Sequence, residues 1–406
     1  MLTPTSLGGP PWGVWARQRL LILACVLASS CRVASVSVSV SPVRPVVPVS
    51  ASQHDRLPVP ASPVVPETRC ESAAIQPELW RFGAGAAVAG VPAVTATGRL
   101  IFGTVEGLVH SLAPSGEYLW SYTLPGAVGG SIVVDEKNER CVVGTQSGAL
   151  EAITRQGTRA WATHIPAGIT GPILWGPRGY LYFADTDQGL YSFARNGVAI
   201  WRLPLPGPIL AGPAVWRREI VVGLEREIWF ISADRKLRKL PLTQNAELFI
   251  PVEDDLLLVK GDHGLDAFSL KGPLWSLTGI RGAAAKSGQI VAFSEESRLL
   301  WLHPDGTEAA RVELGTDPVT QGSRVLNPGQ ILLDAAGSAA VATQSGEVLK
   351  VSPESKVQVL TRLCGRKIRF LSLLDPVSSG ASSLRSVLIA GDDQGVLHAF
   401  DWLGGR

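Results

Sequence analysis

Residues 130–165 read GSIVVDEKNERCVVGTQSGALEAITRQGTRAWATHI and hold four short apolar segments separated by polar turns. Segments of this length that are rich in Val, Ile or Trp and are bounded by Gly, Asp or Asn favour β-strands. Gly148 and Gly157 stand in the second and third turns, where a tight hairpin needs a positive φ. The four predicted strands, called a to d in chain order, are 130–134, 140–143, 149–154 and 159–165.

Strand c contains an apolar-ended tetrad, Leu150-Glu151-Ala152-Ile153, and seven similar tetrads occur elsewhere in the chain. Successive tetrads start 41, 40, 38, 37, 34, 49 and 49 residues apart, close to the length of a four-stranded propeller blade. We therefore expect an all-β fold, an eight-bladed β-propeller of four-stranded antiparallel blades. The tetrads begin at Val109, Leu150, Leu190, Ile228, Leu265, Leu299, Val348 and Leu397.

Tryptophan recurs in the predicted d strands of four units. A large flat side chain at this position can fill the wedge between neighbouring blades, so we expect packing rather than ligand stacking. The four residues are Trp120, Trp161, Trp201 and Trp275.

The eighth unit lacks a d strand of its own, because only residues 401–406 follow its tetrad. Segment 79–82, LWRF, resembles a d strand with its Trp, but it precedes the first blade. We expect this N-terminal strand to pair with residues 396–400 and to close the last blade, which removes an exposed sheet edge.

Charge and cysteine content exclude several classes of partner and site. The 37 Lys and Arg against 35 Asp and Glu give a net charge of +2, so no nucleic-acid partner is expected. The five cysteines form no CxxC pair and no cluster with His, so no metal site is expected. Cys70, Cys141 and Cys364 allow at most one disulfide. Cys70–Cys364 is the first pair to test, and the alternative is three free thiols.

The chain begins with the features of an export signal. Arg17 and Arg19 precede the apolar run 20–28, which has the length of a signal-peptide core and is too short to cross a bilayer. The run ends in Leu27-Ala28-Ser29-Ser30-Cys31, which resembles the lipobox of bacterial lipoproteins. We expect residues 1–31 to be a signal peptide with lipobox and Cys31 to carry lipid. The alternative is ordinary cleavage near Ser30 and a secreted protein.

Residues 32–69 are rich in Pro, Val and Ser, and their frequent prolines favour an extended linker over a folded core. This leaves 70–406 for the propeller. Arg32, rather than Asp, follows Cys31, which resembles the sorting pattern of outer-membrane lipoproteins. We expect an exported protein anchored to the outer membrane, on its periplasmic side rather than on the cell surface.

The Gly turn, the apolar-x-Ala/Ser-apolar tetrad and the following Trp strand resemble the repeats of PQQ-like propellers, over about 78–402. Within that superfamily, a lipidated eight-bladed chain is similar to the BamB family of the outer-membrane β-barrel assembly machinery. The resemblance implies a non-catalytic scaffold without a cofactor, with another protein as its partner. In the most specific form that partner is the barrel-assembly complex.

Two other functions stay open. The quinone-dependent oxidoreductases of the same superfamily have longer chains and often a vicinal Cys-Cys, whereas no two cysteines are adjacent here. An adhesion or glycan-binding module would face outward and bind cell-surface polymer. The six histidines form no catalytic set by spacing, and His110 and His398, at the same place in their tetrads, suggest an interblade hydrogen bond.

The b–c turns and the d-to-a crossovers of a propeller emerge on one face. The b–c turns of this chain are rich in acidic residues and the c–d turns in basic ones, so we expect an acidic partner-binding face. The alternative is ordinary turn chemistry. A long crossover at 315–330 emerges on the same face, whereas the insertion at 376–383 lies on the other. The candidate partner-binding residues are Asp185, Asp187, Asp262, Asp392, Asp393, Asp317 and Asn327.

Overall fold

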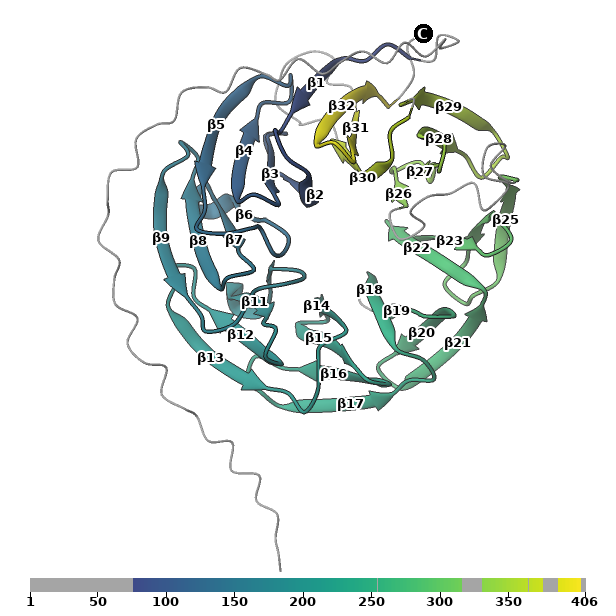
Figure 1. The fold of residues 1–406 in the computed structure, drawn as a ribbon. Helices are drawn as coiled ribbons and strands as arrows, with labels where there is room; N and C mark the ends of the chain where they lie inside the picture. The colour runs from purple at the N-terminus through teal and green to yellow at the C-terminus, as the bar shows by residue number, and fades with distance from the viewer. Residues whose placement is uncertain (1–75, 254, 316–330, 364, 375–385, 403–406) are drawn as a thin grey trace, which may run out of the picture. The chain divides into compact units, whose positions relative to one another are not determined.

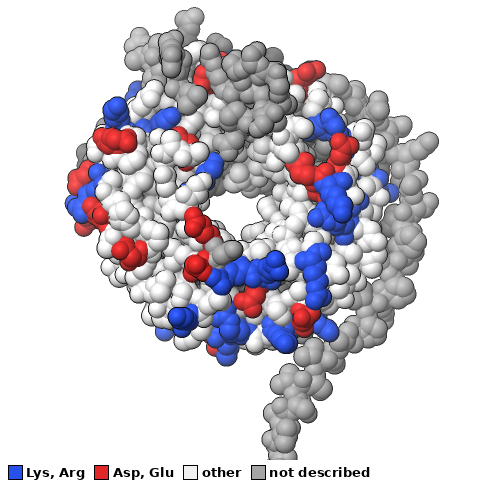
Figure 2. Space-filling view, turned by 180° about the vertical axis from the view of Figure 1, so that it is seen from behind, with Lys and Arg blue, Asp and Glu red and all other residues white. Residues whose placement is uncertain are grey.

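A computed structural model describes residues 76–253, 255–315, 331–363, 365–374 and 386–402. Eight antiparallel four-stranded sheets form a ring, which confirms the predicted eight-bladed β-propeller (Figure 1). Strands a face the axis of the ring and strands d form its outside. Seen from behind, the ring has an opening at its centre (Figure 2).

The first four blades are continuous in sequence. Blade 1 consists of β2 (Val88–Val94), β3 (Leu100–Thr104), β4 (Leu108–Leu112) and β5 (Tyr118–Thr123). Blade 2 consists of β6 (Val133–Asp135), β7 (Arg140–Gly144), β8 (Ala149–Thr154) and β9 (Arg159–His164). Blade 3 consists of β10 (Leu174–Trp175), β11 (Leu181–Ala184), β12 (Gly189–Phe193) and β13 (Ala199–Pro204). Blade 4 consists of β14 (Ala211–Trp216), β15 (Glu219–Leu224), β16 (Glu227–Ile231) and β17 (Leu237–Pro241).

The last blade takes its outer strand from the other end of the chain. Blade 5 consists of β18 (Ala246–Val252), β19 (Leu256–Gly261), β20 (Gly264–Ser269) and β21 (Gly272–Thr278). Blade 6 consists of β22 (Ile280–Lys286), β23 (Gln289–Ser294), β24 (Arg298–Leu302) and β25 (Glu308–Glu313). Blade 7 consists of β26 (Leu332–Leu333), β27 (Ala339–Ala342), β28 (Glu347–Val351) and β29 (Val357–Arg362). Blade 8 consists of β30 (Ile368–Leu374), β31 (Val387–Asp392), β32 (Val396–Asp401) and β1 (Trp80–Gly83).

The predicted closure by the N-terminal strand is confirmed. Trp80 of β1 pairs with Ala399 of β32, and Phe82 pairs with Leu397. The Glu78 carboxylate, just before β1, lies 2.6 Å from Nδ1 of His398 and joins segments 320 residues apart in sequence. Phe82 is buried in the cluster that spans blades 8 and 1. The N-terminal segment is thus held to the last blade by backbone pairing and the Glu78–His398 contact, and Phe82 packs between the last and first blades.

The inner strand of blade 2 differs from its prediction. It covers Val133–Asp135 rather than 130–134, because the preceding residues make isolated bridges to neighbouring segments. Gly130 pairs with Gly171 of the next crossover, and a Cβ on Gly130 would lie 2.2 Å from the Gly171 carbonyl oxygen. The backbone approach that Gly130 permits therefore replaces the first part of the predicted strand. Single-turn 3-10 helices, η1 (Glu136–Asn138) and η2 (Pro177–Gly179), lie in the a–b connections of blades 2 and 3.

The core consists of layers between neighbouring blades. Between blades 1 and 2, for example, Ile101 and Val109 pack against Cys141, Val143 and Ile153. Middle strands such as β3 are buried along their whole length because both of their faces meet another blade. Area buried between sheets is the main favourable contribution to the stability of such a ring.

Four d-strand tryptophans dock on a glycine in the c–d turn of the following blade. The Trp120 Nε1–H donates to the Arg155 carbonyl oxygen at 2.9 Å, and a Cβ on Gly157 would lie 2.7 Å from the Trp120 ring. The predicted packing role is confirmed, and Trp201 packs in the cluster between blades 3 and 4, beside Tyr182 of its own blade. The docked pairs are Trp80–Gly116, Trp120–Gly157, Trp161–Gly197 and Trp275–Gly306.

Each of these d-strand tryptophans pairs with a small residue of strand c in its own blade. Blade 6 reverses the order, with Trp301 on strand c opposite Ala310 on strand d. Blade 4 places Phe230 on strand c opposite Arg238, whose guanidinium lies 3.8 Å from the ring centroid. One large and one small group, in either order, fill a similar volume between blades. The small–large pairs are Ala399–Trp80, Ser111–Trp120, Ala152–Trp161, Ser192–Trp201 and Ala267–Trp275.

Candidate protein-binding face

The b–c turns share a side-chain cap that accounts for two of the predicted site residues. In six blades, the side chain of the last residue of strand b, or of the residue directly after it, accepts the backbone N–H of the residue four positions later, with donor–acceptor distances between 2.6 and 3.3 Å. A short oxygen acceptor is all that this position requires, so Thr, Ser and Asp are interchangeable in it. The acceptors are Thr104, Thr145, Asp185, Ser294, Thr343 and Asp392.

Asp185 is buried as part of this cap. Its Oδ1 accepts the Gly189 N–H at 2.6 Å, and its Oδ2 lies 3.2 Å from the Arg202 guanidinium. The Arg202 guanidinium also donates to the Tyr191 hydroxyl, which fixes all three groups against one another. With 5% of its surface exposed, Asp185 stabilises the turn and presents no carboxylate to a partner.

Asp392 has the same role in blade 8. Its Oδ1 accepts the N–H groups of Gln394 and Val396, and its Oδ2 lies 3.6 Å from both Arg366 and His398. Burial alone would raise the pKa of Asp392, but His398 and the backbone donors outweigh burial and lower that pKa. A charged carboxylate is therefore built into the turn, and reversing its charge would break the turn.

Three predicted residues remain accessible on this face. Asp187 and Asp262 are exposed and form no ion pair among the described residues. Asp393 is half-buried and accepts the Lys367 N–H at 3.2 Å. Asp317 and Asn327 lie outside the described residues, together with most of the 315–330 crossover and the whole 376–383 insertion.

The b–c face carries fewer unpaired acidic side chains than the composition of its turns predicts. Lys239 of β17 lies 2.8 Å from Glu227, and Arg362 of β29 pairs with Glu347. The prediction of an acidic face counted only the residues of the turns. It left out these basic residues of strand d, because the pairing of the strands decides which turn each of them reaches. Within the described residues, the carboxylates of this face without an ion pair are Glu106, Asp187, Glu225, Asp262, Glu295 and Asp393.

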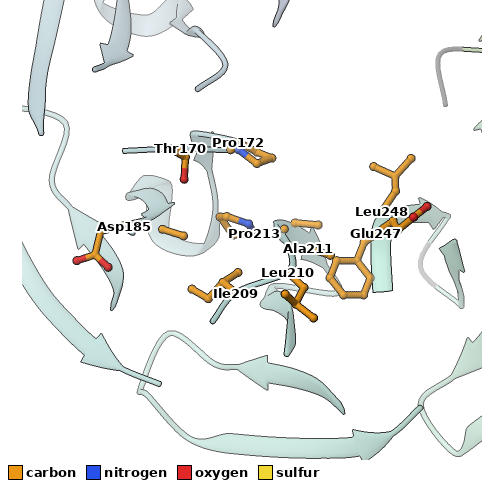
Figure 3. A pocket seen from close by; sticks show the side chains of 14 residues that line it. Thr170, Pro172, Asp185, Ile209, Leu210, Ala211, Pro213, Glu247 and Leu248 are labelled. Carbon is orange, nitrogen blue, oxygen red and sulfur yellow. The ribbon is translucent and has the colours of Figure 1, made fainter. Parts of the chain in front are cut away.

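A pocket of about 420 Å³ opens on the inner side of blades 3 to 5 (Figure 3). Pro172 comes from the crossover into blade 3, Ile209 and Leu210 from the crossover into blade 4, and Leu248 from β18. Leu210 and Leu248 are 44% and 38% exposed, so two large apolar side chains face solvent at one pocket. An apolar concavity with polar neighbours is a common form of binding site.

Sequence reasoning did not find this pocket. Its lining comes from two crossovers and an inner strand, which only the curvature of the ring brings together. One local signal was present in Pro206-Gly207-Pro208-Ile209-Leu210, a stiff connection that places two apolar residues where polar ones are usual. Asp185 also lines this pocket, but it lies far from Leu248 in the sequence, and no sequence pattern connects the two residues.

The remaining reactive groups offer little chemistry. No group of three metal-ligating side chains occurs in the part of the chain that the structure describes. Burial raises the pKa of the Cys141 thiol to about 12, which keeps it protonated and unreactive at neutral pH. Cys70 and Cys364, the pair to test for a disulfide, lie outside the described residues. No helix among the described residues has the length and apolar character needed to cross a membrane.

The predicted interblade hydrogen bond of His398 is wrong, because its Nδ1 lies 2.6 Å from Glu78, which precedes the β1 strand of the same blade. Burial disfavours the charged ring of His398, yet the carboxylates of Asp392 and Glu78 outweigh burial and raise its pKa. His110 differs, because both of its ring nitrogens lack a side-chain partner and it packs on Phe82 and Phe102. Burial lowers the pKa of His110.

Comparisons with known proteins agree with this fold. Residues 73–167 match the family model described as outer membrane protein assembly factor BamB. The BamB structure from Moraxella catarrhalis superposes with a TM-score of 0.62 at 15% identity, covering 81% of this chain and 100% of that one. Saccharomyces cerevisiae Sqt1 superposes with a TM-score of 0.63 at 13% identity, covering 82% and 100%. No curated protein sequence matches the chain. The family match over residues 73–167, the sequence repeats and the ring agree on an eight-bladed β-propeller with PQQ-like repeats that is similar to BamB.

Proposed function

We propose that this chain is a non-catalytic scaffold that binds a partner protein on its b–c face, at the pocket of blades 3 to 5. The observation that carries the proposal is the pair of exposed leucines, Leu210 and Leu248, at one pocket of the ring. A rigid scaffold lowers the entropy lost on binding, and apolar anchors with a polar rim are typical of protein interfaces. The likeness to BamB supports a protein partner.

The finer form of the proposal is that the partner is the outer-membrane barrel-assembly complex. The test is a pull-down from cross-linked membranes, probed for barrel-assembly subunits. Leu210→Ser with Leu248→Ser should lower capture at least about tenfold, as expected for loss of interface anchors. Leu119→Ser, on the outer strand β5 and 39% exposed, is the matched control and should leave capture unchanged.

The acidic residues are tested separately. Asp187→Lys with Asp262→Lys should weaken capture and leave the melting temperature close to wild type, because both side chains are exposed. Asp185 is not suitable for such a test, since its charge reversal would unfold the turn. Unchanged capture in the leucine and aspartate variants together would show that the partner does not use this face.

Membrane anchoring through Cys31 is the second part of the proposal, supported by the lipobox-like Leu27-Ala28-Ser29-Ser30-Cys31. Cys31→Ala should release the protein from membranes, and mass spectrometry should find an acyl adduct only on the wild type. Protease added to intact cells should leave the protein uncut if it faces the periplasm. Cleavage there would favour the surface adhesion module instead.

The absence of catalysis is also proposed. The purified protein should contain no quinone and show no dye-linked dehydrogenase activity. Bound quinone, or dye reduction that depends on an alcohol or sugar, would favour the oxidoreductase alternative.

A further inference from the structure

Exposed apolar residues gather on one edge of the ring, away from the pocket. Twelve large hydrophobic side chains are exposed among the described residues, and five of them belong to the outer parts of three consecutive blades. Such a concentration differs from the single exposed residues that every protein has. The five are Val198, Ile200, Leu237, Leu270 and Leu274, each between 44% and 57% exposed.

All five lie at the same end of their strands. Val198 stands directly before β13, at the end of the c–d turn of blade 3, and Leu237 begins β17 after the c–d turn of blade 4. Leu270 lies within the c–d turn of blade 5. β13, β17 and β21 are consecutive outer strands on one arc of the ring (Figure 1). The c–d corner of blades 3 to 5, defined by these five residues, is therefore an apolar edge on the outside of the propeller.

Basic side chains accompany this corner. Arg235, Lys236 and Lys271 are exposed in the same c–d turns and form no ion pair among the described residues. The one acidic residue of those turns, Asp234, is paired with Arg178 at 2.6 Å. Figure 2 shows Lys and Arg side chains, with some Asp and Glu among them, over the lower part of the ring, where Figure 1 places blades 3 to 5.

We propose that the c–d corner of blades 3 to 5 rests on an anionic lipid surface. Apolar side chains enter the headgroup boundary of a bilayer, while Lys and Arg beside them bind the acidic headgroups. A protein partner would need a matching cavity for tips that project from three separate blades on a convex edge. A lipid surface adapts to them without such a match.

This contact would orient the ring. The c–d and b–c turns lie at opposite ends of the strands, so a propeller resting on its c–d corner keeps the b–c face accessible. The contact does not depend on the proposed function, because it uses different residues from the pocket and different residues from Cys31.

The experiment measures local contact in the full chain, so that any anchor contributes equally to all samples. An environment-sensitive fluorescent amino acid replaces Leu237 or, as a matched control, Val357. Val357 begins β29 of blade 7, is 42% exposed and follows Lys356, but Glu354 stands in the same turn and no other exposed large hydrophobic residue belongs to that blade.

Phosphatidylglycerol-containing vesicles should shift the emission at position 237 to the blue and leave position 357 unchanged. The shift should disappear with Arg235→Glu, Lys236→Glu and Lys271→Glu combined, and also with Leu270→Ser combined with Leu274→Ser. It should be absent with pure phosphatidylcholine vesicles. Circular dichroism checks that each variant is folded.

The proposal is overturned if positions 237 and 357 respond equally, or if folded charge variants keep the shift. It is also overturned if neither position responds. A shift at position 237 caused by a soluble barrel-assembly subunit, and not by vesicles, would show that the corner binds protein.

Discussion

The interface between blades 1 and 2 and the interface between blades 4 and 5 are built differently from the same repeat. At the first, Trp120 docks on Gly157, and the b–c turns close on the hydroxyls of Thr104 and Thr145. At the second, β17 carries no Trp, and its place opposite Phe230 is taken by Arg238. Phe230 packs inward, in the cluster that spans both blades.

The turns of blades 4 and 5 are also held differently. Both b–c turns have two residues, and their N–H groups bond to side chains of the crossover between the blades. Arg226 donates to Asn245, and His263 donates to Gln244. In blades 1 and 2 the side-chain cap lies within the turn and the crossovers add backbone acceptors, whereas in blades 4 and 5 the crossover supplies side-chain acceptors. The pocket and its two exposed leucines adjoin this less regular part of the ring.

The largest expected effect tests whether the large and small groups between strands c and d are interchangeable. Trp301→Ala in blade 6 should cost about 3–5 kcal/mol, because Trp301 is 5% exposed and leaves a cavity. Adding Ala310→Trp restores the order found in blade 2 and should recover about a third or more of that loss. Denaturant unfolding measures both, and no recovery would mean that the two orders are not equivalent.

A second prediction concerns the glycine under Trp120. Gly157 has φ 81°, and a Cβ there would lie 2.7 Å from the Trp120 ring, so Gly157→Ala should cost about 2–4 kcal/mol. Gly279 has φ 69° with nothing within 4 Å, so Gly279→Ala should cost only the backbone strain of about 1–2 kcal/mol. Equal losses of unfolding free energy would show that the Trp–Gly contact adds nothing.

The turn cap gives a smaller effect. Thr145→Val keeps the shape of a fully buried residue but removes the acceptor of the Ala149 N–H, and should cost about 1–2 kcal/mol. Glu225→Ala, in the uncapped turn of blade 4, should change stability by less than about 0.5 kcal/mol. If thermal unfolding shows the reverse order, the caps do not distinguish the two kinds of blade.

The smallest effect is the pH dependence of the His398–Glu78 pair at the ring closure. The folded pKa of His398 is raised, so its contribution is fully present below the unfolded pKa of about 6.5 and is lost as pH rises through the folded pKa. Glu78→Gln should therefore lower stability by about 1 kcal/mol near pH 6 and by less near pH 9. His110 acts with the opposite sign, but it is present in both proteins and cancels in the difference. A variant whose deficit grows with pH would contradict the pairing.

Sequence alone predicted the blades and their closure because both rest on local patterns that recur. The Trp of Leu79-Trp80-Arg81-Phe82 matches those of later d strands, so its partner followed from the missing strand at the other end. The pocket was missed because Ile209 and Leu248 meet only through the curvature of the ring. Asp185 and Asp392 looked like surface charges, although Thr at the same position of blades 1, 2 and 7 was a readable sign of a hydrogen-bond acceptor.

The pairing of β1 with β32 has a consequence for the moment of synthesis. Trp80 emerges from the ribosome long before Ala399, its partner, and the two segments are separated by about 320 residues. At roughly 5–20 residues per second, the first strand waits about 16–64 s with its backbone donors unpaired. During that interval the nascent chain carries a free sheet edge at its start and no complete last blade. Any factor that binds unpaired strands could act during this interval, which ends when the strands of blade 8 have been synthesised.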